Sequence, residues 1–384
     1  MRFQKSTIPG EDMKRGLEMV NKRRELIENS DDGPIVCEFG VNCLAASLHP
    51  GYIKAGIKDK KEVTKDCIRI TLASLGADGR FPYFRAGQFI TLCAKVRDAY
   101  LNRPYSIVSS PLDALKGKLE VIVQRKGIFS SWLIDEAQIG VELMVLDPHG
   151  DFCHDDLRDT HAVLAIAGGS GVTPFLSMMK AIEEKSEDFE LTLLYGVRKR
   201  EQMLADPKDF HSSRIRIIPV LSEEECEGYE HGFIGAKLIG KYRKEDEDIF
   251  MCGPDAMYSY VEKELSKLGI KPSKIRRERN SIGDRAVDEV KVFDLKVHIR
   301  DEVFKVKARN DETIVTALER AGIRTNVRCR NGSCGFCHSR LIKGEYHVDE
   351  NNDFRRAADK KFGYIHPCCS YPESDLEIDV PYTE

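Results

Sequence analysis

The feature that most constrains this chain is a group of cysteines near its C-terminal end. Cys329, Cys334 and Cys337 are spaced C-x4-C-x2-C, and a fourth cysteine, Cys368, follows later in the sequence. The loop CRNGSCGFC is rich in small residues, which let a backbone fold tightly and point its N–H groups at sulfur. This pattern is typical of a loop that holds a two-iron, two-sulfide (2Fe-2S) cluster. A structural zinc site is the alternative.

The length and charge of the chain limit the classes of protein to consider. Its 384 residues predict two or three domains. The balance of 59 Lys and Arg against 63 Asp and Glu predicts no nucleic acid or anionic membrane as a partner. No apolar run approaches the roughly 18 residues that cross a bilayer, so we expect no membrane span.

The cysteines also bear on the cellular compartment. The chain has twelve of them, and its start, MRFQKSTIPGEDMKRG, lacks the apolar core of a secretory signal. A reducing cytoplasm is therefore the expected location. Most of the eight cysteines outside the C-terminal group are expected to be inert core thiols. These eight are Cys37, Cys43, Cys67, Cys93, Cys153, Cys226, Cys252 and Cys369.

Changes of pattern along the chain predict a multidomain fold. Residues 1–61 form an N-terminal arm of unassigned role. We expect residues 1–30 to be a helix packed on the next domain, with partner docking as the alternative. Its apolar face comprises Met13, Leu17, Val20 and Ile27.

Residues 62–155 contain short segments that alternate apolar and polar residues, with one helix at about 130–137. This pattern predicts a small antiparallel β-barrel. The predicted strands include 66–72, 87–93 and 119–123.

Residues 156–275 alternate apolar strands with Gly-rich turns and helices, which predicts a doubly wound parallel sheet. The predicted strands are 162–167, 191–195, 215–221 and 248–251, and a helix is predicted at 175–184.

The polar residues 276–291 are expected to be a linker. Residues 292–384 are expected to form an α+β module, with strands at 293–299 and 303–307, a helix at 312–321, and the cysteine loop.

The sequence Arg103-Pro104-Tyr105-Ser106 in the barrel region suits a flavin. Alternate side chains of a strand face the same way, so Arg103 and Tyr105 can contact one ligand. Tyr105 offers a flat ring to the isoalloxazine, Ser106 a hydroxyl near its reactive nitrogen, and Arg103 a guanidinium for phosphate. A helix predicted to begin in GIFSSWL, residues 127–133, would bind a diphosphate through its N-terminal N–H groups. The simpler alternative is a strand with an exposed tyrosine and a surface arginine.

Two motifs of the α/β region suit a nicotinamide dinucleotide. The sequence AGGSGVTP, residues 167–174, follows an apolar strand and precedes a helix, so its glycines let the chain approach a pyrophosphate. Cys252-Gly253-Pro254 ends the fourth strand, where open α/β sheets bind ligands. A thiol there would reach the nicotinamide carbon that carries the hydride; a buried core thiol is the alternative.

Charged residues after two strands bear on the choice between NADH and NADPH. A 2′-phosphate favours Arg or Lys, whereas a free ribose tolerates a carboxylate. Residues 198–200, Arg-Lys-Arg, suit NADPH, but residues 223–225, three glutamates, would repel the extra phosphate. We therefore expect NADH.

The motifs RPYS, GIFSS, AGGSGVTP, CGP and the cysteine loop occur here in one order. That order resembles the ferredoxin–NAD(P)H reductase superfamily, in the group with a ferredoxin fused at the C-terminus, to which oxygenase reductases belong. The resemblance covers about residues 62–384. It implies an antiparallel β-barrel flavin domain, a doubly wound α/β nucleotide-binding domain, and an α+β ferredoxin domain of the β-grasp type.

The resemblance also implies roles for individual residues. Ser106 and Cys252 would be catalytic, at the site of hydride transfer. The flavin would be held by Arg103, Pro104, Tyr105, Ser106, Gly127, Ser130 and Ser131. The nicotinamide cofactor would be held by Gly168, Gly169, Gly171, Thr173, Cys252, Gly253 and Pro254. Iron would be ligated by Cys329, Cys334, Cys337 and Cys368, with Cys368 favoured over its neighbour Cys369.

The GIFSS helix start is more like the FAD-binding members of the superfamily, so we expect FAD, with FMN as the alternative. In a Rieske centre two histidines replace two of the four cysteine ligands. All four cysteines are present in this chain, so His338 and His366 are not needed as ligands. We therefore expect both histidines near the surface.

These observations predict an NAD(P)H-dependent flavoprotein reductase. It would pass electrons from NADH through FAD and the 2Fe-2S cluster to a protein acceptor, such as an oxygenase, a ferredoxin or another redox enzyme. The alternatives are a non-catalytic electron-transfer subunit of a larger redox complex and a zinc-stapled regulatory protein.

Overall fold

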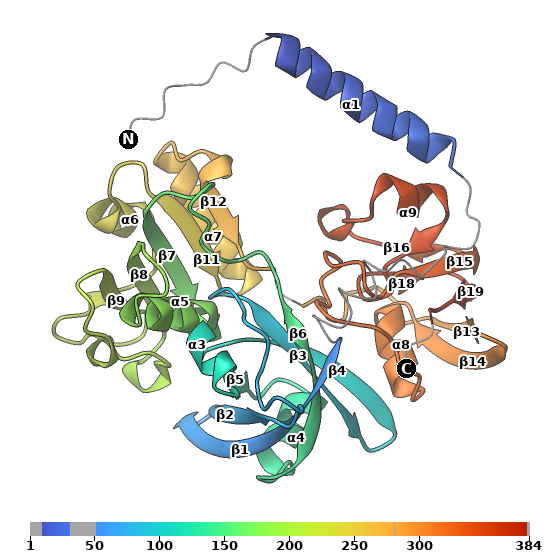
Figure 1. Cartoon of the computed structure of the whole chain (residues 1–384), viewed down its shortest axis with the longest axis horizontal. Coiled ribbons are helices and arrows are strands. Elements are labelled where there is room, and N and C mark those ends of the chain that lie inside the picture. The colour runs from blue at the N-terminus through green and yellow to red at the C-terminus, as the bar shows by residue number, and fades with distance from the viewer. Residues whose placement is uncertain (1–9, 31–50, 280, 382–384) are drawn as a thin grey trace. The chain divides into compact units, whose positions relative to one another are not determined.

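The computed structural model describes residues 10–30, 51–279 and 281–381, without the side chains of residues 10–13. The chain divides into two units according to its internal contacts. The barrel–sheet unit comprises Leu44–Ile282 and Glu319–Asn331. The C-terminal unit comprises Gly283–Leu318 and Gly332–Glu384, together with Met1–Cys43. Figure 1 shows the elements of both units.

Six antiparallel strands of the barrel–sheet unit form a sheet in the order β4-β3-β6-β1-β2-β5. A bridge between Ile107, just after β4, and Val121 of β5 joins the two ends of this sheet. The predicted β-barrel is therefore confirmed. Its strands are β1 (Tyr52–Thr64), β2 (Cys67–Ser74), β3 (Phe89–Val96), β4 (Ala99–Ser106), β5 (Lys118–Gln124) and β6 (Glu142–His149), with helices α3 (Pro111–Leu115) and α4 (Ile128–Asp135).

Strand β1 starts at Tyr52, ahead of the predicted boundary at residue 62. Its first half alternates in the manner of a barrel strand, with Ile53, Ala55 and Ile57 buried and Lys54 exposed. The charged residues 58–62, KDKKE, follow at once and interrupt this apolar alternation. The sequence pattern therefore becomes recognisable only at the next strand.

The second sheet of this unit is wholly parallel, in the order β10-β9-β8-β7-β11-β12. β12 extends the sheet into residues that we expected to begin the linker at 276. The strands are β7 (Ala162–Gly168), β8 (Glu190–Val197), β9 (Ile215–Leu221), β10 (Glu230–His231), β11 (Asp248–Cys252) and β12 (Ile275–Arg277). The helices are α5 (Thr173–Glu183), α6 (Ala236–Tyr242) and α7 (Asp255–Lys267), with short 3-10 turns η1 (Gly169–Val172), η2 (Arg200–Gln202), η3 (Pro207–Asp209) and η4 (Pro272–Lys274).

Helices cover both faces of this parallel sheet. Ala165 of β7 belongs to the core with Phe175 of α5, whereas its neighbour Leu164 packs with Ile239 of α6 and Val261 of α7. Successive strand residues point to opposite faces, so β7 is buried on both sides and almost wholly apolar. Each fully buried leucine or isoleucine stabilises such a core by roughly 1.5–3 kcal/mol. The predicted doubly wound fold is confirmed.

The C-terminal unit is built on a mixed five-stranded sheet, in the order β14-β13-β19-β15-β17. β13 runs parallel to β19, and the other neighbours are antiparallel. Helix α8 buries its apolar side, including Ile314 and Leu318. This confirms the α+β module. Its elements are β13 (Val292–Ile299), β14 (Glu302–Arg309), α8 (Ile314–Arg320), β15 (Ser339–Lys343), β16 (Tyr346–His347), η5 (Glu350–Asn352), α9 (Ala357–Lys361), β17 (Tyr364–Ile365), β18 (Tyr371–Pro372) and β19 (Leu376–Asp379). The last two residues of α8, Glu319 and Arg320, are counted with the barrel–sheet unit.

The predicted N-terminal helix is present as α1 (Gly10–Glu28). Leu17 and Val20 on its apolar face are 56% and 55% exposed, whereas we expected this face to be packed on the next domain. Lys361 donates to the carbonyls of Ile27 and Ser30, at 2.6 and 2.9 Å, and so places a cation at the helix C-terminus. Residues 1–9, Cys37 and Cys43 lie outside the described residues.

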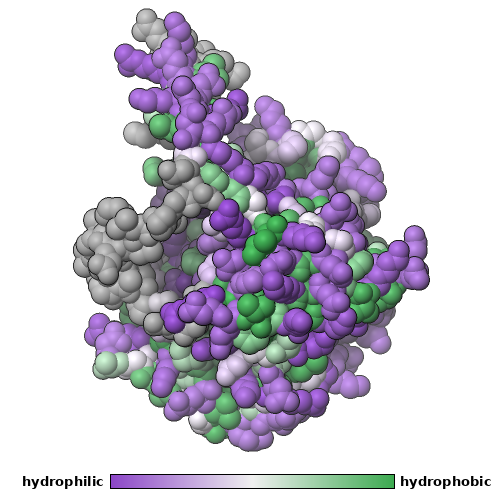
Figure 2. Space-filling model, turned by 90° about the vertical axis from the view of Figure 1, so that its right-hand side faces the viewer, coloured by the Kyte–Doolittle hydropathy of each residue, from purple (hydrophilic) through white to green (hydrophobic). Residues whose placement is uncertain are grey.

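The surface drawn in Figure 2 is mostly hydrophilic, with smaller hydrophobic groups between the charged residues. Exposed apolar side chains in the C-terminal unit include Val292, Val303 and Ile342. No helix within the described ranges is long and apolar enough to cross a bilayer.

Candidate functional site

The predicted flavin residues 103–106 lie on strand β4, which pairs with β3 so that Tyr105 is opposite Ile90 and Arg103 opposite Leu92. Residues 102–106 of this strand are all half-buried, unlike the wholly buried core strands of the barrel–sheet unit. The ring of Tyr105 stacks on Phe129 of α4, with centroids 6.4 Å apart and planes at 29°. Burial raises the pKa of the Tyr105 phenol, which therefore stays neutral at physiological pH. Arg103 and Tyr105 thus share one face of the strand, and Ser106 follows Tyr105 at the strand's end.

The guanidinium of Arg103 already has a carboxylate partner in this structure. Its Nη1 donates to both carboxylate oxygens of Glu319, at 2.9 and 3.0 Å, and to the Asn102 carbonyl at 2.8 Å. Arg103 remains half-buried, so an incoming phosphate would bind the same guanidinium from its open side.

Helix α4 begins at the predicted Gly127-Ser130-Ser131 sequence, and Ser130 shapes that beginning. The Ser130 hydroxyl accepts from the N–H groups of Lys126 and Gly127, both at 2.9 Å, and donates to the Gly127 carbonyl. Ser130 is buried, Ser131 is half-buried and Gly127 is exposed. A Cβ placed on Gly127 would meet no atom within 4 Å, so the space beside the helix start is open. These features fit a flavin diphosphate at this N-terminus.

The two nicotinamide motifs are brought into direct contact. β7 and β11 are neighbours, with Ala167 opposite Cys252. A Cβ on Gly171 would stand 2.1 Å from the Cys252 carbonyl oxygen, so only glycine permits this approach. A Cβ on Gly168 would lie 2.7 Å from Met257 Sδ and 3.1 Å from Pro254 Cδ.

The rest of the first motif leads into a helix. Gly169 has a φ of +54°, in the left-handed region that favours glycine. Thr173 donates from its hydroxyl to the Ser170 carbonyl at 2.9 Å and opens α5, with Pro174 in the first turn. The Thr173 N–H also donates to the Ser170 carbonyl, so α5 continues η1 and this helical segment begins directly after β7, an arrangement that suits a pyrophosphate.

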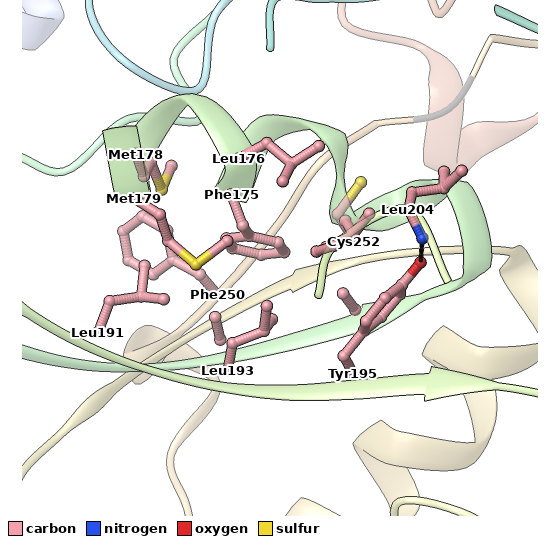
Figure 3. Packing of buried hydrophobic residues seen from close by; sticks show 14 of the residues in the cluster. Phe175, Leu176, Met178, Met179, Leu191, Leu193, Tyr195, Leu204, Phe250 and Cys252 are labelled. Carbon is pink, nitrogen blue, oxygen red and sulfur yellow. Dashed lines mark hydrogen bonds between the residues drawn. The ribbon is translucent and has the colours of Figure 1, made fainter. Parts of the chain in front are cut away.

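Cys252 is buried, at 6% exposure, and lies in the same core as Phe175 and Leu176 of α5 and Tyr195 of β8 (Figure 3). The Tyr195 hydroxyl accepts from the Leu204 N–H at 3.0 Å. Burial, followed by the Glu278 carboxylate, raises the pKa of the Cys252 thiol well above its usual value. The thiol is therefore neutral and suited to packing against a ring rather than to nucleophilic attack.

Sequence reasoning missed two residues beside this turn. The Tyr258 hydroxyl accepts from the Gly253 N–H at 3.2 Å and donates to the Glu278 carbonyl at 2.8 Å. Burial raises the pKa of the Glu278 carboxyl to about 8, and the nearby Asp151 acts in the same direction. The signal in the sequence is weak, because Glu278 follows β12, in residues that look like a polar linker.

The residues that we expected to select NADH form a network. Arg198 pairs with Glu223 at 3.6 Å, and the Glu224 carboxylate accepts from the Arg200 N–H at 3.0 Å. The Glu223 carboxylate thus competes with a 2′-phosphate for the Arg198 guanidinium, and Glu224 adds a second negative charge beside the basic residues that follow β8.

The cysteine loop has the backbone that a cluster requires. Arg330, Gly332 and Gly335 have φ values of +56°, +83° and +74°, so the chain reverses direction repeatedly. A Cβ on Gly332 would lie 2.6 Å from the Asn352 carbonyl oxygen. The Asn331 N–H donates to Cys329 Sγ, with nitrogen and sulfur 3.4 Å apart. N–H groups aimed at sulfur stabilise thiolate ligands, so the loop fits a 2Fe-2S cluster.

The four predicted ligands are distributed over both units. Cys334, Cys337 and Cys368 belong to the C-terminal unit, and Cys329 to the segment Glu319–Asn331 of the barrel–sheet unit. Cys329, Cys337 and Cys368 are buried, and Cys334 is half-buried. Within the described residues, no three His, Cys, Asp or Glu side chains are grouped around a position for a single metal ion.

The neighbour of Cys368 is engaged elsewhere. The Cys369 thiol donates to the His366 carbonyl at 3.4 Å, and a Cβ on Gly332 would lie 2.9 Å from its sulfur.

His338 is exposed, as predicted. The prediction for His366 is wrong: its ring is buried, at 3% exposure, because Nδ1 lies 2.8 Å from the Gly332 carbonyl and supports the loop.

Comparison with known families agrees with this division of sites. The oxidoreductase FAD-binding domain family matches residues 54–154, and the oxidoreductase NAD-binding domain family matches residues 165–263. The 2Fe-2S iron-sulfur cluster binding domain family matches residues 297–373, which include all four predicted ligands.

Whole proteins are similar over most of their length. One subunit of the 1,2-phenylacetyl-CoA epoxidase of Escherichia coli K12 is 31% identical over 341 residues, covering 82% of this chain and 94% of that protein. The glycine betaine monooxygenase reductase subunit of Chromohalobacter salexigens is 26% identical, covering 77% of this chain and 87% of that protein. The solved structure of phthalate dioxygenase reductase has the same fold, with a TM-score of 0.63 and 21% identity over 87% of this chain and 98% of its own.

Proposed function

The chain belongs to the ferredoxin–NAD(P)H reductase superfamily, in the group with a C-terminal 2Fe-2S domain, and from this membership we propose that its electron acceptor is an oxygenase component. It is an NAD(P)H-dependent flavoprotein reductase that passes electrons from NADH through FAD and a 2Fe-2S cluster to a protein acceptor. One observation carries the proposal for the acceptor. A relative matched over 94% of its own length is named as part of an epoxidase.

When bound, FAD would supply the hydride chemistry with NADH, and a 2Fe-2S cluster would supply one-electron chemistry. The residues of the chain bind and orient them. We assign Tyr105 to the isoalloxazine face, Ser106 to its reactive nitrogen, and Arg103 to the phosphates. The half-buried strand β4, with its ring, hydroxyl and guanidinium adjacent, supports this assignment.

For the nicotinamide cofactor, we assign the pyrophosphate to the turn of Gly168, Gly169 and Gly171 and the first turn of α5 at Thr173. The contact between Gly171 and Cys252 supports one continuous site from this turn to Gly253 and Pro254. The neutral thiol of Cys252 would then pack against the nicotinamide and exclude water beside the transferred hydride.

For the cluster, we assign Cys329, Cys334, Cys337 and Cys368 as ligands, supported by the N–H group aimed at Cys329 Sγ. We propose the domain bounds expected from the sequence with two changes: the barrel begins at β1, and the parallel sheet extends through β12. We also propose a cytoplasmic location, which the free thiols of Cys67, Cys153 and Cys252 support.

The order of electron flow is tested with Cys334→Ser in the full chain. NADH-dependent reduction of ferricyanide, which can take electrons at the flavin, should stay within twofold of wild type. Reduction of the protein acceptor should be abolished. Loss of both activities in a folded, flavin-containing variant would contradict the order.

The nature of the acceptor is tested by reducing the purified chain with NADH and mixing it with the oxygenase component that co-purifies with it. Rapid oxidation of the chain, coupled to hydroxylation or epoxidation, is expected. Faster transfer to a free ferredoxin, with none to any oxygenase component, would overturn the proposal.

A further inference from the structure

A buried carboxylate, Glu319, lies between two arginines of different functional sites. Its side chain is 3% exposed, and it pairs with Arg103 at 2.9 Å and with Arg330 at 2.8 Å. Arg103 belongs to the flavin strand β4, and Arg330 directly follows the predicted cluster ligand Cys329. Glu319 has no role in the binding of the flavin or of the nicotinamide cofactor as proposed above.

The residues that follow Glu319 are bonded to the same strand. The side-chain amide of Asn102 donates to the carbonyls of Thr325 and Val327, at 3.1 and 3.3 Å. Arg324 lies over the ring of Tyr100, 5.0 Å from its centroid. These contacts, together with the Arg103 ion pair, bond the segment Glu319–Asn331 to three residues of the flavin strand, Tyr100, Asn102 and Arg103.

Two neighbouring strands complete the attachment of the segment. The Thr91 hydroxyl of β3 donates to the Arg328 carbonyl at 2.9 Å, and Arg328 pairs with Asp147 of β6. A Cβ on Gly322 would lie 2.9 Å from the Asp98 carbonyl oxygen, so the segment touches the β3–β4 turn as well. The whole segment belongs to the barrel–sheet unit.

We propose that Glu319 is a positioning residue for electron transfer: its carboxylate anchors the segment bearing Cys329 on the flavin strand through Arg103 and Arg330. The identification of the two sites, a flavin site at Arg103 and a cluster site at Cys329, rests on the proposed function. The anchoring itself rests only on contacts of this chain.

The charge of Glu319 is what makes this anchor strong. Bonds between a carboxylate and guanidinium groups are roughly twice as strong as neutral ones, and burial removes competing water. Without the negative charge, the two guanidinium groups would face each other as like charges in a poorly solvated place. A neutral residue of the same shape would therefore loosen the segment while leaving the packing intact.

The anchoring is tested first in the chain without cofactors, by amide hydrogen exchange of Glu319→Gln. We expect exchange in residues 320–331 to be at least tenfold faster than in wild type, with β7 and β8 unchanged. Glu120→Gln is the matched control, because Glu120 is also a buried carboxylate held by two cations, Lys118 and Lys180. Unchanged exchange in residues 320–331 would overturn the proposal whether or not the chain is a reductase.

The consequence for electron transfer is tested by rapid mixing of the holoprotein with NADH. Flavin reduction in Glu319→Gln should stay within twofold of wild type, and cluster reduction should be at least tenfold slower. Cluster reduction within twofold of wild type would also overturn the proposal. A wild-type chain that takes up no flavin or cluster would defeat the proposed function, and the exchange experiment would still decide the anchoring.

A second variant keeps the test decisive if Glu319→Gln does not fold. Asn102→Ala removes two bonds to the segment and no charge. It should change exchange and cluster reduction in the same directions, by roughly threefold. Wild-type values for both would count against the anchoring.

Discussion

At the scale of single residues, the adjacent thiols Cys368 and Cys369 show how two chemically equal side chains take different roles. Cys369 donates its S–H to a backbone carbonyl, which requires the protonated thiol. A cluster ligand has to be a thiolate. The pair therefore offers a matched test of the predicted fourth ligand.

We expect Cys368→Ser to lower the amount of iron and sulfide bound after anaerobic reconstitution by at least about tenfold, because one of the four predicted thiolate ligands is lost. Cys369→Ser should retain both, since serine can make the same bond to the His366 carbonyl. Iron analysis and the visible spectrum measure the outcome. The reverse pattern would assign the cluster to Cys369.

Glu278 allows a prediction of pH dependence at the same scale. Its pKa is raised to about 8 in the folded chain, above the ordinary value of 4.5. The folded state thus binds the proton more tightly than the unfolded state, so the wild-type chain loses stability as pH rises from about 4.5 to about 8. Glutamine does not titrate and escapes this loss.

Glu278→Gln should therefore gain stability relative to wild type between pH 6 and pH 9, by about 2–3 kcal/mol. Urea unfolding of the cofactor-free chain at both pH values measures this difference. At pH 4, where both states are protonated, the variant and wild type should differ least. A difference that does not grow with pH would show that the carboxyl is ionised normally.

At the scale of secondary-structure elements, the nucleotide site depends on how closely the turn after β7 approaches the end of β11. A Cβ on Gly171 would stand 2.1 Å from the Cys252 carbonyl oxygen, and a backbone atom cannot rotate aside. Gly171→Ala must therefore separate the two turns. Overpacking of this kind costs about 1–3 kcal/mol.

We expect Gly171→Ala to lower the free energy of unfolding by that amount and to raise the KM for NADH. Gly240→Ala in α6 is the control, because its Cβ would meet no atom within 4 Å and alanine favours a helix. Denaturant unfolding and steady-state kinetics measure the two effects. Equal behaviour of both variants would contradict the close contact.

Elements with a regular apolar pattern could be predicted from the sequence, because their burial is regular. β7 is buried on both faces and was predicted within a residue of its bounds, and β9 was predicted with its bounds unchanged. β1 and β12 were missed for a shared reason. Their polar residues resemble an arm and a linker, and only pairing with distant strands makes them part of a sheet.

The candidate site divides in the same way. Arg103, Tyr105 and Cys252 stand in local motifs, so the sequence alone pointed to them. Tyr258 and Glu278 lie beside the Cys252-Gly253-Pro254 turn in the folded chain, but no local sequence motif marks either residue. The carboxylate that holds Arg103 lies far along the chain, so it could not be predicted either.

At the scale of the whole molecule, the longest segment that the three matched families leave out is the N-terminal arm. The FAD-binding family match begins at residue 54, whereas α1 lies at Gly10–Glu28. Leu17, Met19, Val20 and Leu26 of this helix are exposed. Exposed apolar side chains on one helix suit a protein surface as a partner. We propose that the arm contributes to recognition of the acceptor.

The test is deletion of residues 1–49, which removes α1 and leaves β1 intact. NADH-dependent ferricyanide reduction should stay within twofold of wild type, because the flavin and nucleotide sites lie elsewhere. Transfer to the cognate acceptor should fall at least about tenfold, as expected when apolar contacts worth about 1.4 kcal/mol or more are lost. In the full chain, Leu17→Gln combined with Val20→Gln should reproduce part of this loss, and Lys22→Gln on the same helix should not. Transfer that survives the deletion unchanged would leave acceptor recognition to the reductase and cluster domains.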